Sequence, residues 1–230
     1  MPIVENLAEV RGRIADAAAR SGRSAESVKL IAVSKYVDEP VIRQLLEAGC
    51  HDLGEARPQQ LWRKAEAFDA ADIHWHLIGH LQTNKVRRTL PIISLIHSIE
   101  SEKLLDVVNA EAALLTRKFD VLLEVNVSGD DAKHGLQPEH VRPLLERAAA
   151  WPFVRIRGLM GMAALEGGVD VARRNFVALR QLRDRLIDVC PPEVSLSELS
   201  MGMSGDYEAA IEEGATMVRV GSALFEGVEA

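Results

Sequence analysis

The chain alternates short apolar runs with longer amphipathic stretches from residue 30 onward. The apolar runs are Leu30–Val33, His51–Leu53, Trp75–Ile78, Ile92–Ile96, Val121–Val125, Ile156–Met160, Leu196–Leu199 and Met217–Val220. Most of them are continuously apolar, which is typical of parallel strands whose two faces are both buried. The eight runs therefore predict a parallel sheet.

Amphipathic segments with helical spacing lie between these runs, and one precedes them. In that first segment, Leu7, Val10 and Ile14 share one face of an expected helix over residues 5–20. The later segments are Glu39–Ala48, Gln59–Ala67, Thr83–Thr89, Ser101–Leu115, Pro138–Ala149, Val171–Val189 and Asp206–Glu213, with a short last helix expected at Ala223–Glu226.

Strands that alternate with helices in this way place the chain in the α/β class. We predict a single (β/α)8 TIM barrel with an extra N-terminal helix, forming one domain over residues 1–230. A doubly wound open sheet is the alternative. It is disfavoured because no Gly-x-Gly-x-x-Gly sequence follows the first run.

Composition narrows the class of protein further. The 230 residues are 47% hydrophobic and 27% charged, which is ordinary for a globular protein, and the net charge of −7 argues against nucleic acid as a partner. Cys50 and Cys190 fit no metal-ligand spacing and suggest a reduced compartment. Because we find no signal sequence and no apolar stretch of ~20 residues, we expect a cytoplasmic protein without a membrane partner.

Lys35 closes the first apolar run and precedes the next expected helix. An amine at the end of a buried strand is expected to be poorly hydrated, and a neutral amine can attack an aldehyde to form a Schiff base. The alternative is a strand-end lysine that only extends its amine into solvent.

Two glycine- and serine-containing turns follow the last two runs. The first is Ser200–Asp206, which contains Ser204 and Gly205 and leads into a helix expected near Tyr207; the second contains Gly221 and Ser222. Such turns leave backbone N–H groups free to bind an anion, and the loops after the last strands of a barrel are the usual phosphate site. The alternative for the first turn is that Ser204 or Asp206 simply caps the helix.

Arg219 lies inside an apolar strand, between Val218 and Val220. A buried guanidinium needs a partner, which is ordinarily a carboxylate in the protein; the alternative is an acceptor on a bound ligand.

His74 and His76 alternate along another run, so that they share one face of a strand. A zinc site would need matching ligands on later strands, and we find none at convincing positions, since His134 and His140 lie in a loop and at a helix start. We therefore expect no metal, and a zinc-dependent hydrolase remains only as a minor alternative.

These segments together resemble one protein family. The matching stretches are Ala32-Val33-Ser34-Lys35, Leu53-Gly54-Glu55, His76-Leu77-Ile78-Gly79, Leu81-Gln82-Thr83-Asn84-Lys85, Ile96-His97-Ser98-Ile99, Glu124-Val125-Asn126-Val127-Ser128, Lys133-His134-Gly135, Arg157-Gly158-Leu159-Met160, Leu199-Ser200-Met201-Gly202-Met203-Ser204-Gly205-Asp206 and Arg219-Val220-Gly221-Ser222. In this order they resemble the pyridoxal phosphate homeostasis proteins, which are single-domain relatives of the alanine racemase barrel. The resemblance covers essentially the whole chain.

The resemblance implies a barrel that holds pyridoxal 5′-phosphate (PLP). It implies that Lys35 is the Schiff-base lysine, that Ser204, Gly205, Gly221 and Ser222 hold the phosphate, and that Arg219 meets the pyridine nitrogen. The family is associated with buffering and delivering the cofactor and has no established catalytic turnover, so the resemblance implies no catalytic residue. PLP-dependent apo-enzymes are the implied recipients, and we expect a monomer or weak dimer.

Two positions depart from the family's usual pattern. Ala56 stands where the family has asparagine, and His80 stands where it has proline. We expect the first to remove a polar contact to the cofactor ring and the second to place an additional imidazole near the rim of the site.

The main alternative function is that of a PLP-dependent amino-acid racemase. Racemisation needs a base on each face of the substrate carbon, and the only tyrosines available to oppose Lys35 are Tyr36 and Tyr207. We find no second domain in the sequence to supply another. Arginine remains protonated, so a ring nitrogen that faces Arg219 is unprotonated and makes the ring a poor electron sink. A carrier is therefore favoured.

Overall fold

The eight strands form a closed parallel barrel in the computed structural model, which describes residues 2–68, 72–130 and 134–228. Neighbours along the chain pair with one another, and the last strand pairs with the first, at Leu30 opposite Val218. The strands are β1 (Lys29–Val33), β2 (Asp52–Glu55), β3 (His74–Leu77), β4 (Ile93–Ile99), β5 (Phe119–Glu124), β6 (Val154–Met160), β7 (Glu198–Ser200) and β8 (Met217–Val220). The predicted (β/α)8 fold is confirmed.

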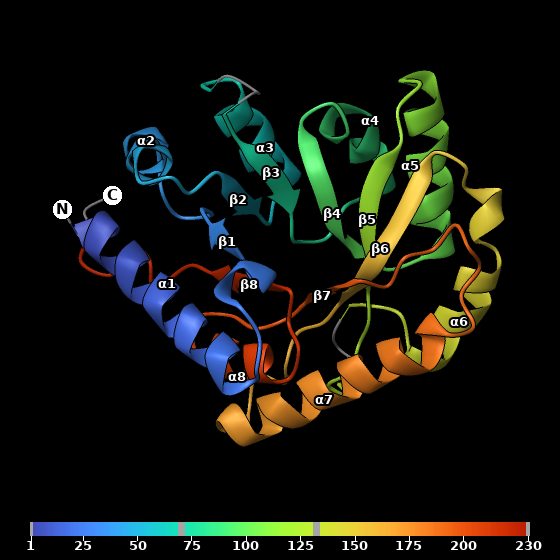
Figure 1. Cartoon of the computed structure of the whole chain (residues 1–230). Coiled ribbons are helices and arrows are strands. Elements are labelled where there is room, and N and C mark those ends of the chain that lie inside the picture. Colours follow the sequence, from blue (N-terminus) through green and yellow to red (C-terminus); the bar gives the residue numbers. More distant parts are fainter. Residues whose placement is uncertain (1, 69–71, 131–133, 229–230) are drawn as a thin grey trace.

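Helices connect the strands and cover the outside of the barrel (Figure 1). They are α1 (Pro2–Arg20), α2 (Glu39–Glu47), α3 (Pro58–Ala65), α4 (Val86–Thr89), α5 (Glu102–Leu114), α6 (Pro138–Glu146), α7 (Gly168–Ile187) and α8 (Tyr207–Glu212), with short 3₁₀ helices η1 (Ala25–Ser27), η2 (Thr83–Lys85) and η3 (Ala148–Ala150). No helix in these described ranges combines the length and the apolar character that crossing a membrane requires.

Several expected segments differ in detail. The apolar run His51–Leu53 marks a strand that in fact covers Asp52–Glu55, and the expected helix Thr83–Thr89 is divided into η2 and α4. Ala223–Glu226 is a series of turns instead of a helix, because its amides bond three residues back, as in Leu224 N–H to Gly221 O at 2.9 Å. The prediction of a terminal helix was therefore wrong.

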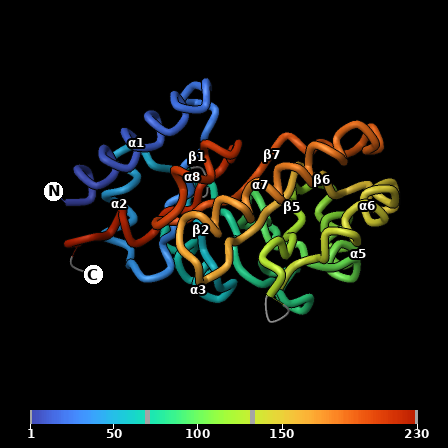
Figure 2. The backbone as a smooth tube through the Cα atoms, turned by 90° about the horizontal axis from the view of Figure 1, so that it is seen from below, coloured from blue at the N-terminus to red at the C-terminus, as the bar shows by residue number. Residues whose placement is uncertain are grey.

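The additional N-terminal helix α1 lies along α8 and reaches the segment after β8 (Figures 1 and 2). Its apolar face, including Leu7 and Val10, is buried, and Arg13 beside that face donates to Glu208 at 2.5 Å. Asn6 Nδ2 donates to the carbonyl oxygens of Leu224 and Glu226 at 3.0 and 2.9 Å. The helix thus fastens the segment that follows the last strand.

The interior of the barrel contains a small apolar cluster, separate from the larger core that includes the helices. Its members come from five strands and are Ile31, Leu95, Leu122, Met160 and Met217. The barrel interior is therefore packed with side chains and is not an open pore.

Candidate functional site

A cavity of about 740 Å³ lies at the carboxyl ends of the strands. Its lining includes all six residues that the sequence predicts as cofactor ligands, together with apolar and backbone groups: Lys35, Ser204, Gly205, Arg219, Gly221, Ser222, Val33, Tyr36, Ile78, Gly79, Met162, Met203 and Phe225. The fold thus brings the ends of β1, β7 and β8 into one site, although β1 and β8 are far apart in the sequence.

Lys35 lies two residues beyond β1 and is exposed to solvent. Its Nζ lies 4.9 Å from the centre of the Tyr36 ring, which is 82% exposed. The expectation that the end of a buried strand would desolvate this amine was wrong, because the strand ends at Val33 and Lys35 lies in the exposed turn that follows. Lys35 is instead an accessible amine at the mouth of the cavity.

The buried lysine of this region is Lys64, on α3. Its Nζ forms an ion pair with Glu55 at the end of β2 and donates to the carbonyl oxygen of Ser34 at 2.5 Å. Ser34 precedes Lys35, so this buried pair holds the base of the segment that carries Lys35. The sequence reasoning missed Lys64, although Pro58, Leu61 and Lys64 follow one another at helical spacing on the buried face of α3.

The two turns after β7 and β8 are joined by a side chain. Ser204 Oγ accepts hydrogen bonds from the amides of Gly221 and Ala223 at 3.1 and 3.5 Å. The N–H groups of Ser204, Gly205 and Ser222 have no hydrogen-bond partner among the residues that the structure describes. Three backbone donors are therefore left free in turns that line the cavity.

Neither expected side-chain cap of α8 forms. Asp206 occupies the N-cap position, but its Oδ1 accepts a hydrogen bond from Met203 N at 2.6 Å instead of from an amide of the helix. Ser204 reaches across to the β8 turn. The capping alternative was therefore wrong, and the two side chains shape the turns themselves.

Arg219 is 3% exposed, on β8. Its Nη1 donates to Ser200 Oγ at 2.6 Å and its Nη2 to the carbonyl oxygen of Gly161 at 3.0 Å. Burial lowers the pKa of Arg219 to about 10, although the charges of Glu124 and Asp206 oppose this, so the guanidinium is protonated at neutral pH. In the described ranges no carboxylate pairs with it directly, so the ordinary carboxylate partner is absent there.

A line of hydrogen bonds runs from Arg219 through the barrel to its opposite end. Ser200 Oγ lies 2.8 Å from His97 Nδ1, His97 Nε2 lies 2.9 Å from His76 Nδ1, and His76 Nε2 lies 3.0 Å from Asp52 Oδ1. Burial lowers the pKa of both histidines, that of His97 well below its usual value, so both rings are neutral at neutral pH. In the sequence these residues belong to separate stretches of the family resemblance, and nothing there indicates that they form one line of hydrogen bonds.

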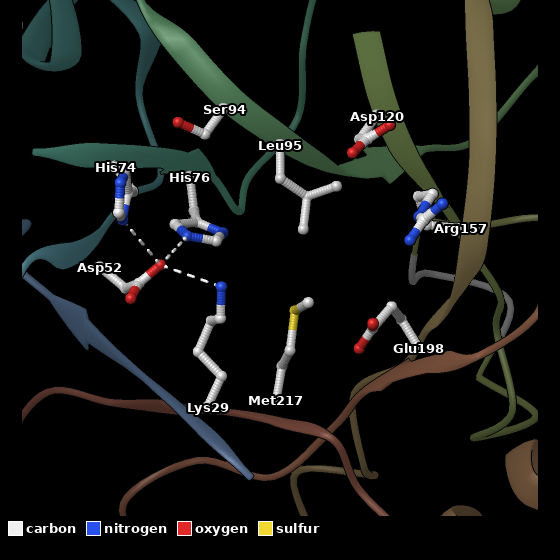
Figure 3. A pocket seen from close by; sticks show the side chains of 10 residues that line it. All are labelled: Lys29, Asp52, His74, His76, Ser94, Leu95, Asp120, Arg157, Glu198 and Met217. Atoms are coloured by element: carbon white, nitrogen blue, oxygen red, sulfur yellow. Dashed lines mark hydrogen bonds and ion pairs between the residues drawn. The ribbon is translucent and has the colours of Figure 1, made fainter. Parts of the chain in front are cut away.

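A second cavity, of about 320 Å³, lies at the amino ends of the strands (Figure 3). Asp52 and His76, at the far end of the line of hydrogen bonds, are among its lining residues. There Asp52 Oδ1 lies within 3.0 Å of His76, 3.3 Å of Lys29 and 3.6 Å of His74. Burial raises the pKa of Asp52, but the hydrogen bond from His76 and the nearby positive charges lower it by more, so Asp52 is a carboxylate acceptor. His74 and His76 do share one face, as predicted, and both are directed to Asp52.

The two departures from the family pattern lie beside the first cavity. Ala56 lines it, and its carbonyl oxygen would lie 2.3 Å from a Cβ atom on Gly79, so only glycine fits at residue 79. His80 lies next to Gly79 and contacts Glu100 at 2.8 Å. Lys133, which belongs to another of the matching stretches, lies outside the described residues.

Comparison with known proteins agrees with this geometry. The sequence matches the alanine racemase N-terminal domain family over residues 6–228. A pyridoxal phosphate homeostasis protein from Aquifex aeolicus is 43% identical over 226 residues, which cover 98% of each chain. One from Pseudomonas aeruginosa is 39% identical and covers 97% of this chain and 94% of its own. The chain belongs to the pyridoxal phosphate homeostasis protein family.

Solved structures of similar proteins have the same fold as this chain. An unknown protein from Bifidobacterium adolescentis is 37% identical, with a TM-score of 0.92 over 97% of this chain and 94% of its own. PipY from Synechococcus elongatus, with PLP bound, is 35% identical, with a TM-score of 0.85 over 97% of this chain and 99% of its own. An alanine racemase from Clostridium difficile shares only the fold, at 16% identity and a TM-score of 0.75, over 97% of this chain and 56% of its own.

Proposed function

We propose that this protein binds PLP in the cavity at the carboxyl ends of the strands and carries and buffers the cofactor for the cell. The observation that carries the proposal is the convergence of three unlike groups on one cavity: the amine of Lys35, the guanidinium of Arg219 and the free amides of two adjacent turns. The names of its relatives and the PLP-bound PipY structure support the same ligand.

The residues present fit each part of this cofactor. The free N–H groups of Ser204, Gly205 and Ser222 suit a phosphate ester, and Gly205 leaves open space where a side chain would otherwise stand. Arg219 is a donor that pairs with no carboxylate in the part of the chain that the structure describes, and it suits an unprotonated ring nitrogen. When bound, the cofactor supplies an aldehyde that an amine can hold covalently, and Lys35 is the accessible amine.

We propose that this binding serves carriage and not turnover. A protonated Arg219 favours an unprotonated ring nitrogen, which weakens the ring as an electron sink. The racemase alternative needs a base opposite Lys35. Tyr36 follows Lys35 on the same segment, and Tyr207 is 1% exposed beneath Arg13, outside the lining of the cavity.

We propose one PLP-binding domain over residues 1–230 that acts in the cytoplasm as a monomer or weak dimer, without nucleic acid or a membrane as partner. Cofactor exposed at the mouth of the barrel could pass to PLP-dependent apo-enzymes, since Lys35 is open to solvent.

Borohydride reduction tests the assignment of Lys35. After incubation with PLP, reduction should fix a pyridoxyl group on the peptide that contains Lys35, and Lys35→Ala should lose the visible absorbance band, whereas Lys85→Ala should keep it. Label on a different lysine would overturn the assignment.

A second assay separates a carrier from a racemase. The loaded protein is incubated with alanine in deuterium oxide, and both deuterium uptake at the α-carbon and chirality are measured. We expect no inversion at the ~1–10³ per second that is typical of enzymes. Inversion at such a rate that is lost in Lys35→Ala would establish the racemase instead.

A further inference from the structure

Three potential metal ligands meet at the mouth of the barrel, on the loops that follow three successive strands. His80 follows β3, Glu100 follows β4 directly, and His134 lies between β5 and α6. One ligand atom from each residue lies within 4.8 Å of the other two. The sequence analysis did not connect these residues, because loops of different lengths separate them along the chain.

The backbone beside each ligand is tied to the barrel. Ser98 Oγ on β4 donates to the carbonyl oxygen of Gly79, next to His80, at 2.6 Å. Leu136 N donates to the carbonyl oxygen of Glu124 at 2.7 Å, which joins the segment after His134 to the end of β5. The three side chains are therefore carried by segments whose positions the strands determine.

Both histidines contact the carboxylate of Glu100, each at a different oxygen. His80 Nδ1 lies 2.8 Å from Glu100 Oε1, and His134 Nδ1 lies 3.2 Å from Glu100 Oε2. Neighbouring donors around a tetrahedral zinc ion, with bonds of about 2.0–2.1 Å, are separated by about 3.3 Å. The two imidazole rings are stacked, with centres 5.1 Å apart.

The second oxygen of Glu100 gives independent evidence for a bound cation. Glu100 Oε2 is buried and has no hydrogen-bond partner among the described residues, since the nearby His134 nitrogen does not meet it with hydrogen-bond geometry. A buried carboxylate oxygen without a partner is costly, and a cation beside it would remove that cost.

We propose that His80, Glu100 and His134 bind a divalent transition-metal ion of the zinc type. Two imidazoles and one carboxylate suit zinc better than magnesium or calcium, which take oxygen ligands. Three protein ligands leave a fourth position for water or for another molecule. The site lies next to Gly79, which lines the large cavity, but it does not depend on the binding of PLP.

The test uses the full chain without added cofactor, freed of metal by a chelator and titrated with zinc chloride in a calorimeter. We expect about one zinc ion per chain. His80→Gln, Glu100→Gln and His134→Gln should each weaken binding by about tenfold or more, an effect that the loss of even a supporting residue produces in metal sites. His140→Gln, an exposed histidine at the start of α6, is the matched control and should bind as the parent does.

Thermal unfolding followed by circular dichroism shows whether each variant is folded. Glu100→Gln is nearly isosteric and keeps the test decisive if a histidine variant does not fold. Magnesium chloride in excess should not displace the zinc. The proposal is overturned if the parent binds no zinc, or if binding persists in the three variants and is lost in His74→Gln, which would place the ion at the opposite end of the barrel.

Discussion

Ser200 Oγ lies 2.8 Å from His97 Nδ1, between strands β7 and β4 and out of contact with solvent. Arg219 can only donate a hydrogen bond to Ser200, so the serine hydrogen is directed to His97. At the other end, Asp52 can only accept one from His76. The two ends therefore fix the direction of every hydrogen bond between them.

This direction predicts the tautomers of both buried histidines. His97 accepts at Nδ1 and donates from Nε2–H to His76 Nδ1, and His76 donates from Nε2–H to Asp52. Long-range ¹⁵N–¹H correlation spectra of histidine-labelled protein should therefore show the Nε2–H form for His76 and His97. A proton on Nδ1 of His97 at neutral pH would contradict the direction of the line.

The same histidines should make the stability of the fold depend on pH. Their pKa values are lowered by burial, so in acid the unfolded chain binds protons that the folded chain does not. The stability that these histidines contribute is therefore fully present above the unfolded pKa of ~6.5 and falls as the pH decreases below it, by at most about 1.4 kcal/mol per pH unit for each histidine until the pH passes its lowered folded pKa.

Urea unfolding between pH 7 and pH 5 measures this slope. His97→Gln removes one of the two buried histidines. Its free energy of unfolding should therefore depend less steeply on pH than that of the parent, whatever the stability of the variant at pH 7. His140→Gln, which removes an exposed histidine, should leave the slope unchanged. Equal slopes for the parent and His97→Gln would show that His97 is not responsible.

The buried ion pair of Lys64 and Glu55 predicts a large effect of a single change. The side chains are 4% and 1% exposed, so Lys64→Met leaves a buried carboxylate without its cation and should cost about 3–5 kcal/mol of stability. Glu55→Gln added to Lys64→Met should restore part of this loss, because the buried charge is then gone. The exposed Lys103→Met, on α5, is the control and should change the urea midpoint little.

Ser222 should contribute to ligand affinity through the phosphate. Hydrogen bonds to a charged group contribute about 1.5–3 kcal/mol each, so Ser222→Ala, which removes the side-chain hydroxyl as a phosphate donor and keeps the backbone N–H, should weaken PLP binding measurably while the protein stays folded. Pyridoxal, which lacks the phosphate, should bind far more weakly than PLP to the parent. Absorbance titrations compare the two ligands, and equal affinities would contradict a phosphate site at these turns.

The sequence by itself determined the fold and the location of the candidate site. Eight apolar runs alternating with amphipathic segments predicted the barrel, because burial on both faces of a parallel strand is visible in a local pattern of residues. The turns at Ser204–Gly205 and Gly221–Ser222 were likewise local, and the structure places both on the large cavity with Lys35 and Arg219.

Only the tertiary structure decided which polar groups meet. His97 and Ser200 are 103 residues apart, and neither the exposure of Lys35 nor the burial of Lys64 followed from the expected end of β1. The cluster of His80, Glu100 and His134 arises because parallel strands deliver their carboxyl ends to one rim. Hydrophobic periodicity is set by neighbours along the chain, whereas a hydrogen bond or a metal ligand set depends on strand register and loop paths that no local pattern encodes.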